Sequence, residues 1–143
     1  MDAREDAEFR LRLAKGFLAE AQQDVSLQRW RSCVDNSQLA TENAAKAVLS
    51  LLGPVGRTHS PSTYLLEAID AGKVPRGDVD RARRLAQLAE QLGRDLHMAS
   101  DYGDEATRRT PWEIFNEPFA RNALRGAEEA VTLAREIGKF REG

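Results

Sequence analysis

The sequence predicts an all-α protein, an up-and-down four-helix bundle with an additional short helix in the crossover over residues 53–77. Every long segment repeats small or apolar residues at alternating spacings of 3 and 4, which places them on one face of an α-helix. No run of five or more residues alternates apolar and polar positions with β-branched side chains, as a half-buried strand would. The repeats are rich in alanine, which lets helix axes approach closely and favours the packing of a bundle.

The first two helices are predicted over residues 4–26 and 29–52. The inward face of the first consists of Ala7, Leu11, Ala14, Leu18, Ala21 and Val25. The inward face of the second consists of Val34, Ser37, Thr41, Ala44, Val48 and Leu51. Gly53 and Pro54 end the second helix, because glycine suits a helix C-terminus and proline cannot continue the helix.

A short helix over residues 62–71 follows, with Ser60-Pro61 at its start and Gly72 at its end. The next long helix is predicted over residues 78–99. Its inward face consists of Ala82, Leu85, Ala89, Leu92, Leu96 and Ala99.

The last part of the chain carries two helix-start signals. The run TPWE from Thr110 to Glu113 is a capping box with proline at the first helical position, which predicts a short turn of helix. Asn116 then caps a final helix over residues 117–140. The inward face of that helix consists of Ala120, Ala123, Ala127, Ala130, Ala134 and Ile137.

Composition excludes several classes of function. The longest stretch without a charge, residues 47–56, is far shorter than the ~20 residues that span a bilayer. The charged N-terminus has no apolar targeting region. We therefore expect a cytoplasmic protein without a membrane partner. A net charge of −2 argues against general DNA binding, which relies on a basic excess. One cysteine (Cys33, interpreted as a core residue) and two histidines make a metal site improbable, and we expect no cofactor.

The candidate ligand site lies at the end of the 78–99 helix and in the loop over residues 100–116. It consists of Arg94, His97, Asp101, Tyr102, Arg108, Arg109 and Trp112. Tyr102 or Trp112 would stack on a base and an arginine would contact a phosphate. The alternative is that the aromatic side chains only fasten the loop to the bundle, and that Arg94 and His97 form a polar face at a helix C-terminus.

Polar residues on the second helix are a further cluster. They are Asn36, Gln38, Glu42, Asn43 and Lys46, next to Trp30 and Arg31. We interpret them as ordinary surface polarity, with a groove or a subunit interface as the alternative.

The second-helix segment carries a family resemblance. Residues 30–53 read WRSCVDNSQLATENAAKAVLSLLG and are followed by His59, which resembles the second-helix signature of HEPN domains. The later runs SDYGDE (100–105) and PWE (111–113) are similar to the loop of small prokaryotic members. The resemblance covers residues 1–143 as a single domain. It implies a helical bundle, usually a homodimer, that is often encoded beside a minimal nucleotidyltransferase and is described as nucleotide-binding.

The sequence departs from the catalytic members of this family. HEPN ribonucleases carry an Arg-x(4–6)-His motif, but the residues five to seven positions before His97 are Leu92, Gln91 and Glu90. Those before His59 are Pro54, Gly53 and Leu52. Arg94 is too close to His97 for the motif.

We therefore expect a non-catalytic protein that binds a nucleotide or a nucleotidyltransferase partner, in a toxin–antitoxin-like or defence module. One alternative is a divergent metal-independent ribonuclease that uses Arg94 as the cation and His97 as the acid–base. The other is a purely structural homodimer, in which aromatic residues near the helix ends would cover a second subunit. Those residues are Trp30, Trp112, Phe115 and Phe119.

Overall fold

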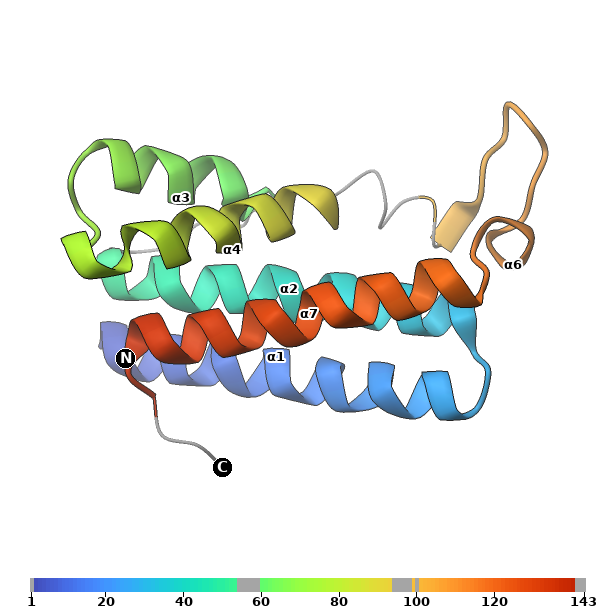
Figure 1. Ribbon diagram of the computed structural model, residues 1–143, viewed down its shortest axis with the longest axis horizontal. Helices are drawn as coiled ribbons and strands as arrows, with labels where there is room; N and C mark the ends of the chain where they lie inside the picture. Colours follow the sequence, from blue (N-terminus) through green and yellow to red (C-terminus); the bar gives the residue numbers. More distant parts are fainter. Residues whose placement is uncertain (1, 54–59, 94–98, 100, 141–143) are drawn as a thin grey trace.

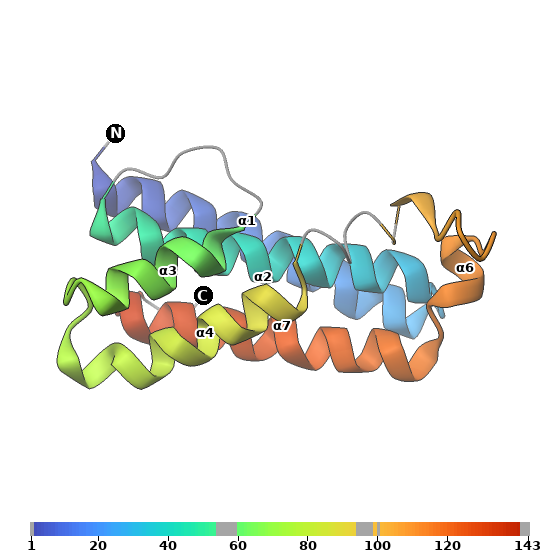
Figure 2. The same cartoon turned by 90° about the horizontal axis from the view of Figure 1, so that it is seen from above.

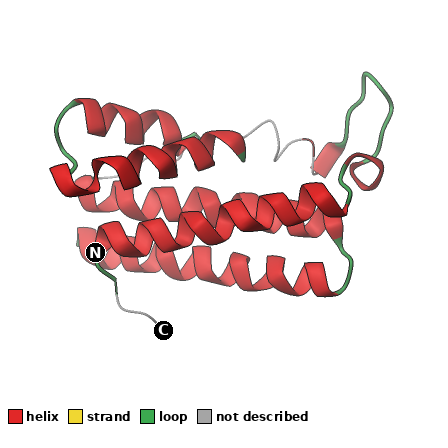
Figure 3. Cartoon of the chain, viewed as in Figure 1, coloured by secondary structure: helices red, strands yellow, loops and turns green. Residues whose placement is uncertain are grey.

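The computed structural model describes residues 2–53, 60–93, 99 and 101–140, and within these ranges it forms helices and no strand (Figure 3). The elements are α1 (Ala3–Ser26), α2 (Trp30–Leu52), α3 (Pro61–Asp70), the 3-10 turn η1 (Arg76–Asp78), α4 (Val79–Gln91), α6 (Pro111–Ile114) and α7 (Glu117–Gly138). The all-α prediction is therefore confirmed.

The four bundle helices are α1, α2, α4 and α7, and successive members run in opposite directions (Figure 1). The helix α2 packs against α1 on one side and α7 on the other, and α4 packs on both α7 and α2. The additional helix α3 lies in the predicted crossover and pairs with α4. This α3–α4 hairpin covers only the half of α2 and α7 that lies near the N-terminal end of α1 (Figure 2).

Small side chains bring the long helices together. The alanines of the predicted faces of α1, α2 and α7 are all buried, so the close approach of axes expected from the sequence is realised. The larger core residues include Val48, Leu65 and Leu85, each at most 1% exposed, where α3 and α4 cover the bundle. Cys33 is buried as predicted, and burial raises the pKa of its thiol.

The prediction for the fourth bundle helix was wrong in its length, because α4 ends at Gln91 and not at residue 99. Leu92 leaves the helical conformation (φ −106°, ψ 44°), and Gly93, a weak helix former, follows it. The Leu92 side chain still enters the core, where it packs in a cluster with Phe115 and Ala123. Burial in that cluster offsets the loss of helical hydrogen bonds.

The polar face of α2 was interpreted as surface polarity, and this was wrong for four of its five residues. Gln38, Glu42, Asn43 and Lys46 are all buried, since α1, α3, α4 and α7 surround α2 and leave it little contact with solvent. Asn36 is half-buried, and its amide donates a hydrogen bond of 2.8 Å to Asp24 of α1.

Three of these buried residues form a hydrogen-bonded ladder along α2, which we call the α2 ladder: Gln38, Glu42 and Lys46. The Gln38 amide donates to one carboxylate oxygen of Glu42 (3.3 Å), and the Lys46 ammonium donates to the other (3.2 Å). The side-chain oxygen of Gln38 has no donor among the described residues. If one partner of a buried ion pair is removed, the other charge stays buried without compensation, which destabilises the fold.

Among the described residues, no helix is both long enough and apolar enough to cross a membrane.

Candidate functional site

The loop between α4 and α6 is braced by its own backbone over residues 103–110. Asp104 and Arg109 form an isolated antiparallel bridge through two hydrogen bonds of 2.9 and 3.1 Å. The Asp104 carboxylate accepts hydrogen bonds from the amides of Ala106 (3.0 Å) and Thr107 (3.3 Å). Arg108 turns the chain with a left-handed φ of 57°. The loop is therefore a defined hairpin that projects from the end of the bundle where α1 turns into α2 (Figure 1).

Gly103 sits where this hairpin begins, at φ 75°, and a Cβ there would lie 2.4 Å from the carbonyl oxygen of Arg109. We predict that Gly103→Ala breaks the hairpin, because the backbone of Arg109 would have to move away. Gly72→Ala is the matched control, since Gly72 has nearly the same φ (72°) with open space around it. That variant should lose only the ~1–2 kcal/mol that a left-handed side chain costs.

Amide NMR spectra and urea melts of the two variants measure the difference. Gly103→Ala should shift the amide signals of residues 103–110 strongly, while Gly72→Ala leaves them in place. If both variants changed the spectra and the stability by the same small amount, residue 103 would not lie close to the Arg109 carbonyl group.

The helical turn α6 fastens the other end of the loop. The predicted capping box is present: the Glu113 amide donates to the Thr110 hydroxyl oxygen (3.4 Å), and the Thr110 amide donates to the Glu113 carboxylate (3.2 Å). Phe115 is buried and meets the ring of Phe119 edge-on at 5.0 Å. Asn116 caps α7 as predicted, by accepting a hydrogen bond from the Phe119 amide.

Two carboxylates of this region, those of Asp104 and Glu113, have lowered pKa values. Hydrogen bonds from Thr107 and Ala106, and the nearby charge of Arg109, lower the pKa of Asp104 below its ordinary value. Hydrogen bonds from Thr110 lower the pKa of Glu113 in the same way. These two carboxylates are therefore ionised at neutral pH and accept hydrogen bonds from backbone amides of the loop.

The structure brings three of the predicted ligand residues, Tyr102, Arg108 and Arg109, together around one open hollow of about 440 Å³, which we call the loop hollow. Its lining consists of Tyr102, Asp104, Glu105, Arg108, Arg109, Thr110 and Pro111. Tyr102 is 70% exposed, so its ring does not serve to anchor the loop.

Asp101 and Trp112 lie instead against the start of α2, where they meet Arg31. The Arg31 guanidinium lies 3.7 Å from the Asp101 carboxylate and 5.6 Å from the centre of the Trp112 ring. Trp112 is 72% exposed, so its ring presents much of its surface to solvent. The sequence placed Arg31 in another cluster, and nothing local to residue 31 indicates that it links the loop to α2.

The other two predicted site residues, Arg94 and His97, lie outside the described residues, as does His59. Among the residues that the structure describes, no three histidine, cysteine, aspartate or glutamate side chains gather to hold a metal ion.

Comparisons with known proteins agree with this fold. The crystal structure of TT1696 from Thermus thermophilus superposes with a TM-score of 0.68 at 22% sequence identity, over 92% of this chain and 97% of that one. That likeness shows the shared fold. A search of curated proteins found no match. The family model of the HEPN domain matches residues 7–141, nearly the whole chain, and the protein therefore belongs to the HEPN domain family.

Proposed function

We propose that this HEPN protein is a non-catalytic, nucleotide-binding member of the family and that its loop hollow is the binding site. The observation that carries the proposal is that the exposed Tyr102 lines the same hollow as Arg108 and Arg109, on a hairpin that is already folded. A preformed site loses little conformational entropy when it binds a ligand.

The side chains of the loop hollow match the two parts of a nucleotide. A base stacks on the Tyr102 ring, an interaction of about 1–3 kcal/mol that tolerates any base. Arg108 and Arg109 supply planar donors that contact phosphate oxygens in pairs. The Asp104 carboxylate accepts hydrogen bonds from the amides of its own hairpin. Glu105 also lines the hollow, so the phosphates bind on the side of the arginines, away from that carboxylate.

Calorimetric titration with AMP, ATP and GTP tests this proposal. Tyr102→Ala is expected to weaken nucleotide binding by about tenfold or more, because it removes the stacking surface. Tyr64→Ala is the matched control, since Tyr64 is also an exposed tyrosine (53%) but lies on α3. Binding that survives Tyr102→Ala unchanged, or falls equally in both variants, contradicts the assignment.

The proposal includes a homodimer that serves as partner of a minimal nucleotidyltransferase in a toxin–antitoxin-like or defence module. Large aromatic side chains gather at the loop end of the bundle, and both Trp112 and Phe119 are exposed there, which favours a covered surface. Phe115, expected to join them, lies in the core. Light scattering should give twice the chain mass at ~10 μM protein, and a monomer mass at that concentration would contradict the dimer.

A further inference from the structure

The charges that line the loop hollow balance one another. Two carboxylates, Asp104 and Glu105, offset two guanidinium groups, Arg108 and Arg109. The whole chain carries a net charge of −2, so it adds no general attraction for anions. A site attracts a highly charged ligand through an excess of the opposite charge, and the described lining has no such excess. The loop hollow therefore suits a nucleotide that brings few negative charges.

The hairpin arranges these side chains in a fixed order along its length. Tyr102 precedes the bridge that joins Asp104 to Arg109. Beyond the bridge the turn begins at Glu105 and ends at Arg108, whose amide donates to the Glu105 carbonyl oxygen (3.3 Å). Successive residues of a strand point to opposite sides, but the left-handed φ of Arg108 breaks this alternation, which lets both arginines line one hollow. The aromatic ring thus belongs to one end of the hairpin, and Glu105 belongs to the turn at the other.

The two carboxylates of the hollow differ in what surrounds them. Asp104 accepts hydrogen bonds from two backbone amides, and the charge of Arg109 helps to lower its pKa. The Arg109 Nε itself donates to the Thr107 hydroxyl oxygen (3.1 Å), which orients that guanidinium along the hairpin. Glu105 is exposed, and within the described part of the chain its carboxylate accepts no hydrogen bond and joins no ion pair. The Glu105 charge is therefore the one most available to act on a ligand among the carboxylates that line the hollow.

The order of groups in a nucleotide can be compared with this order of side chains. The sugar separates the base from the first phosphate, and each further phosphate lies farther from the base. When the base stacks on Tyr102, one phosphate can bind at the arginines and remain apart from Glu105. A chain of three phosphates extends toward the turn, because the three residues from Tyr102 to Glu105 span at most ~10 Å. Like charges repel, so the Glu105 carboxylate disfavours the longer chain.

We propose that the loop hollow selects nucleoside monophosphates over triphosphates and that Glu105 determines this preference. The inference rests on the proposed binding of a nucleotide in the loop hollow. It adds a residue that acts against the wrong ligand, and such unfavourable contacts are a common source of specificity. ATP binds through the same Tyr102, Arg108 and Arg109 side chains, but more weakly than AMP.

Calorimetric titration of the full chain with AMP and with ATP tests this preference. The buffer contains EDTA, because a bound divalent cation would neutralise the phosphates. We expect AMP to bind about threefold or more tighter than ATP, and added NaCl to reduce the difference, since salt screens exposed charges. Glu105→Gln should tighten ATP binding by about threefold or more and change AMP binding less than twofold. Glu105 is exposed at the turn, so its replacement keeps the fold.

Glu67→Gln is the matched control for the charge. Glu67 is an exposed glutamate on α3, and its replacement changes the net charge of the chain by the same amount. This variant should leave the ratio of AMP to ATP affinity unchanged. A ratio that shifts equally in Glu67→Gln and Glu105→Gln would show that net charge alone decides, and it would overturn the role of Glu105.

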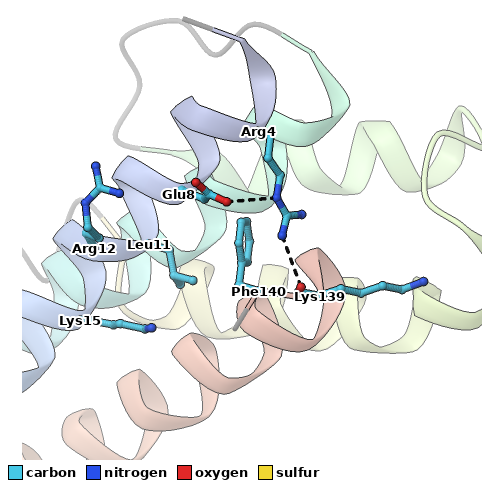
Figure 4. Close-up of a pocket in the computed structure, with 7 residues that line it drawn as sticks. All are labelled: Arg4, Glu8, Leu11, Arg12, Lys15, Lys139 and Phe140. Carbon is cyan, nitrogen blue, oxygen red and sulfur yellow. Dashed lines mark hydrogen bonds and ion pairs between the residues drawn. The ribbon is translucent and has the colours of Figure 1, made fainter. Parts of the chain in front are cut away.

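A second control addresses the hollow at the opposite end of the bundle, where α1 begins and α7 ends (Figure 4). Arg4 is engaged there, since it donates to the carbonyl oxygens of Gly138 and Lys139 and lies over the Phe140 ring. In Figure 4 the Lys139 side chain extends away from Arg4 and Phe140. Lys139→Gln should therefore leave both affinities unchanged, whereas Arg108→Gln should weaken AMP binding by about fivefold or more. Equal weakening by the two variants would contradict binding in the loop hollow.

The outcomes separate this inference from the proposed function. If ATP binds as tightly as AMP, or if Glu105→Gln leaves the ratio of affinities unchanged, the selectivity is refuted while nucleotide binding stands. If neither nucleotide binds, or if Tyr102→Ala changes nothing, the proposed function fails and this inference fails with it.

Discussion

Lys46→Met is expected to lower the free energy of unfolding by about 3–5 kcal/mol, because it breaks a buried ion pair. Lys46 and Glu42 form an ion pair of 3.2 Å on α2, with side chains only 10% and 6% exposed. Methionine fills nearly the same volume but cannot neutralise Glu42, so the carboxylate remains buried without the ammonium. Urea-induced unfolding followed by circular dichroism measures the loss.

The matched control is Arg121→Met on α7. Arg121 pairs with Glu117 at the same i,i+4 spacing and at 2.7 Å, but both side chains are about half exposed. Water solvates Glu117 when its partner is removed, so the loss should stay within about 0.5 kcal/mol. If the two variants cost the same, solvent reaches the α2 ladder, and its assignment as a buried element is wrong.

Leu92→Ala should lower the free energy of unfolding by about 2–5 kcal/mol. Leu92 lies just beyond the end of α4 and packs with Phe115, Ala120 and Ala123 in the core cluster below the loop. Truncation to alanine removes buried apolar contacts and leaves a cavity between α4 and α7. Thermal or urea unfolding under identical conditions gives the comparison with the unmodified chain.

Leu27→Ala serves as the reference for Leu92→Ala, since Leu27 is 50% exposed where α1 ends. An exposed leucine loses little on truncation, so we expect a change within about 0.5 kcal/mol. An unchanged melting curve for Leu92→Ala would show that Leu92 does not face the bundle interior.

The helices of this fold were predictable because their signals are local. The alanine faces of α1, α2 and α7, the proline that starts α3 and the capping box at Thr110 each depend on residues within a few positions. The end of α4 was missed because apolar residues continue the helical period through Ala99. The competing burial of Leu92 against Phe115 is a contact between distant parts of the chain.

Contacts between distant parts of the chain also determine the burial of the α2 polar residues and the placement of the loop residues, which the sequence could not predict. The polar residues of α2 look like a solvated face, and only the packing of four other helices around α2 buries Gln38 and Lys46. Within the loop, residue types suggested a ligand site, and three of them do share one hollow. Asp101 and Trp112 instead meet Arg31, which no pattern of spacing could indicate.

NMR titration of the ¹⁵N-labelled chain with ATP tests whether a nucleotide binds in the loop hollow. We expect progressive, saturating amide shifts for Tyr102, Arg108, Arg109 and their hairpin neighbours, and little change near Arg4 and Phe140 at the other end of the bundle. Shifts confined to residues outside the hairpin, or no saturable shifts in the hairpin, would contradict this assignment.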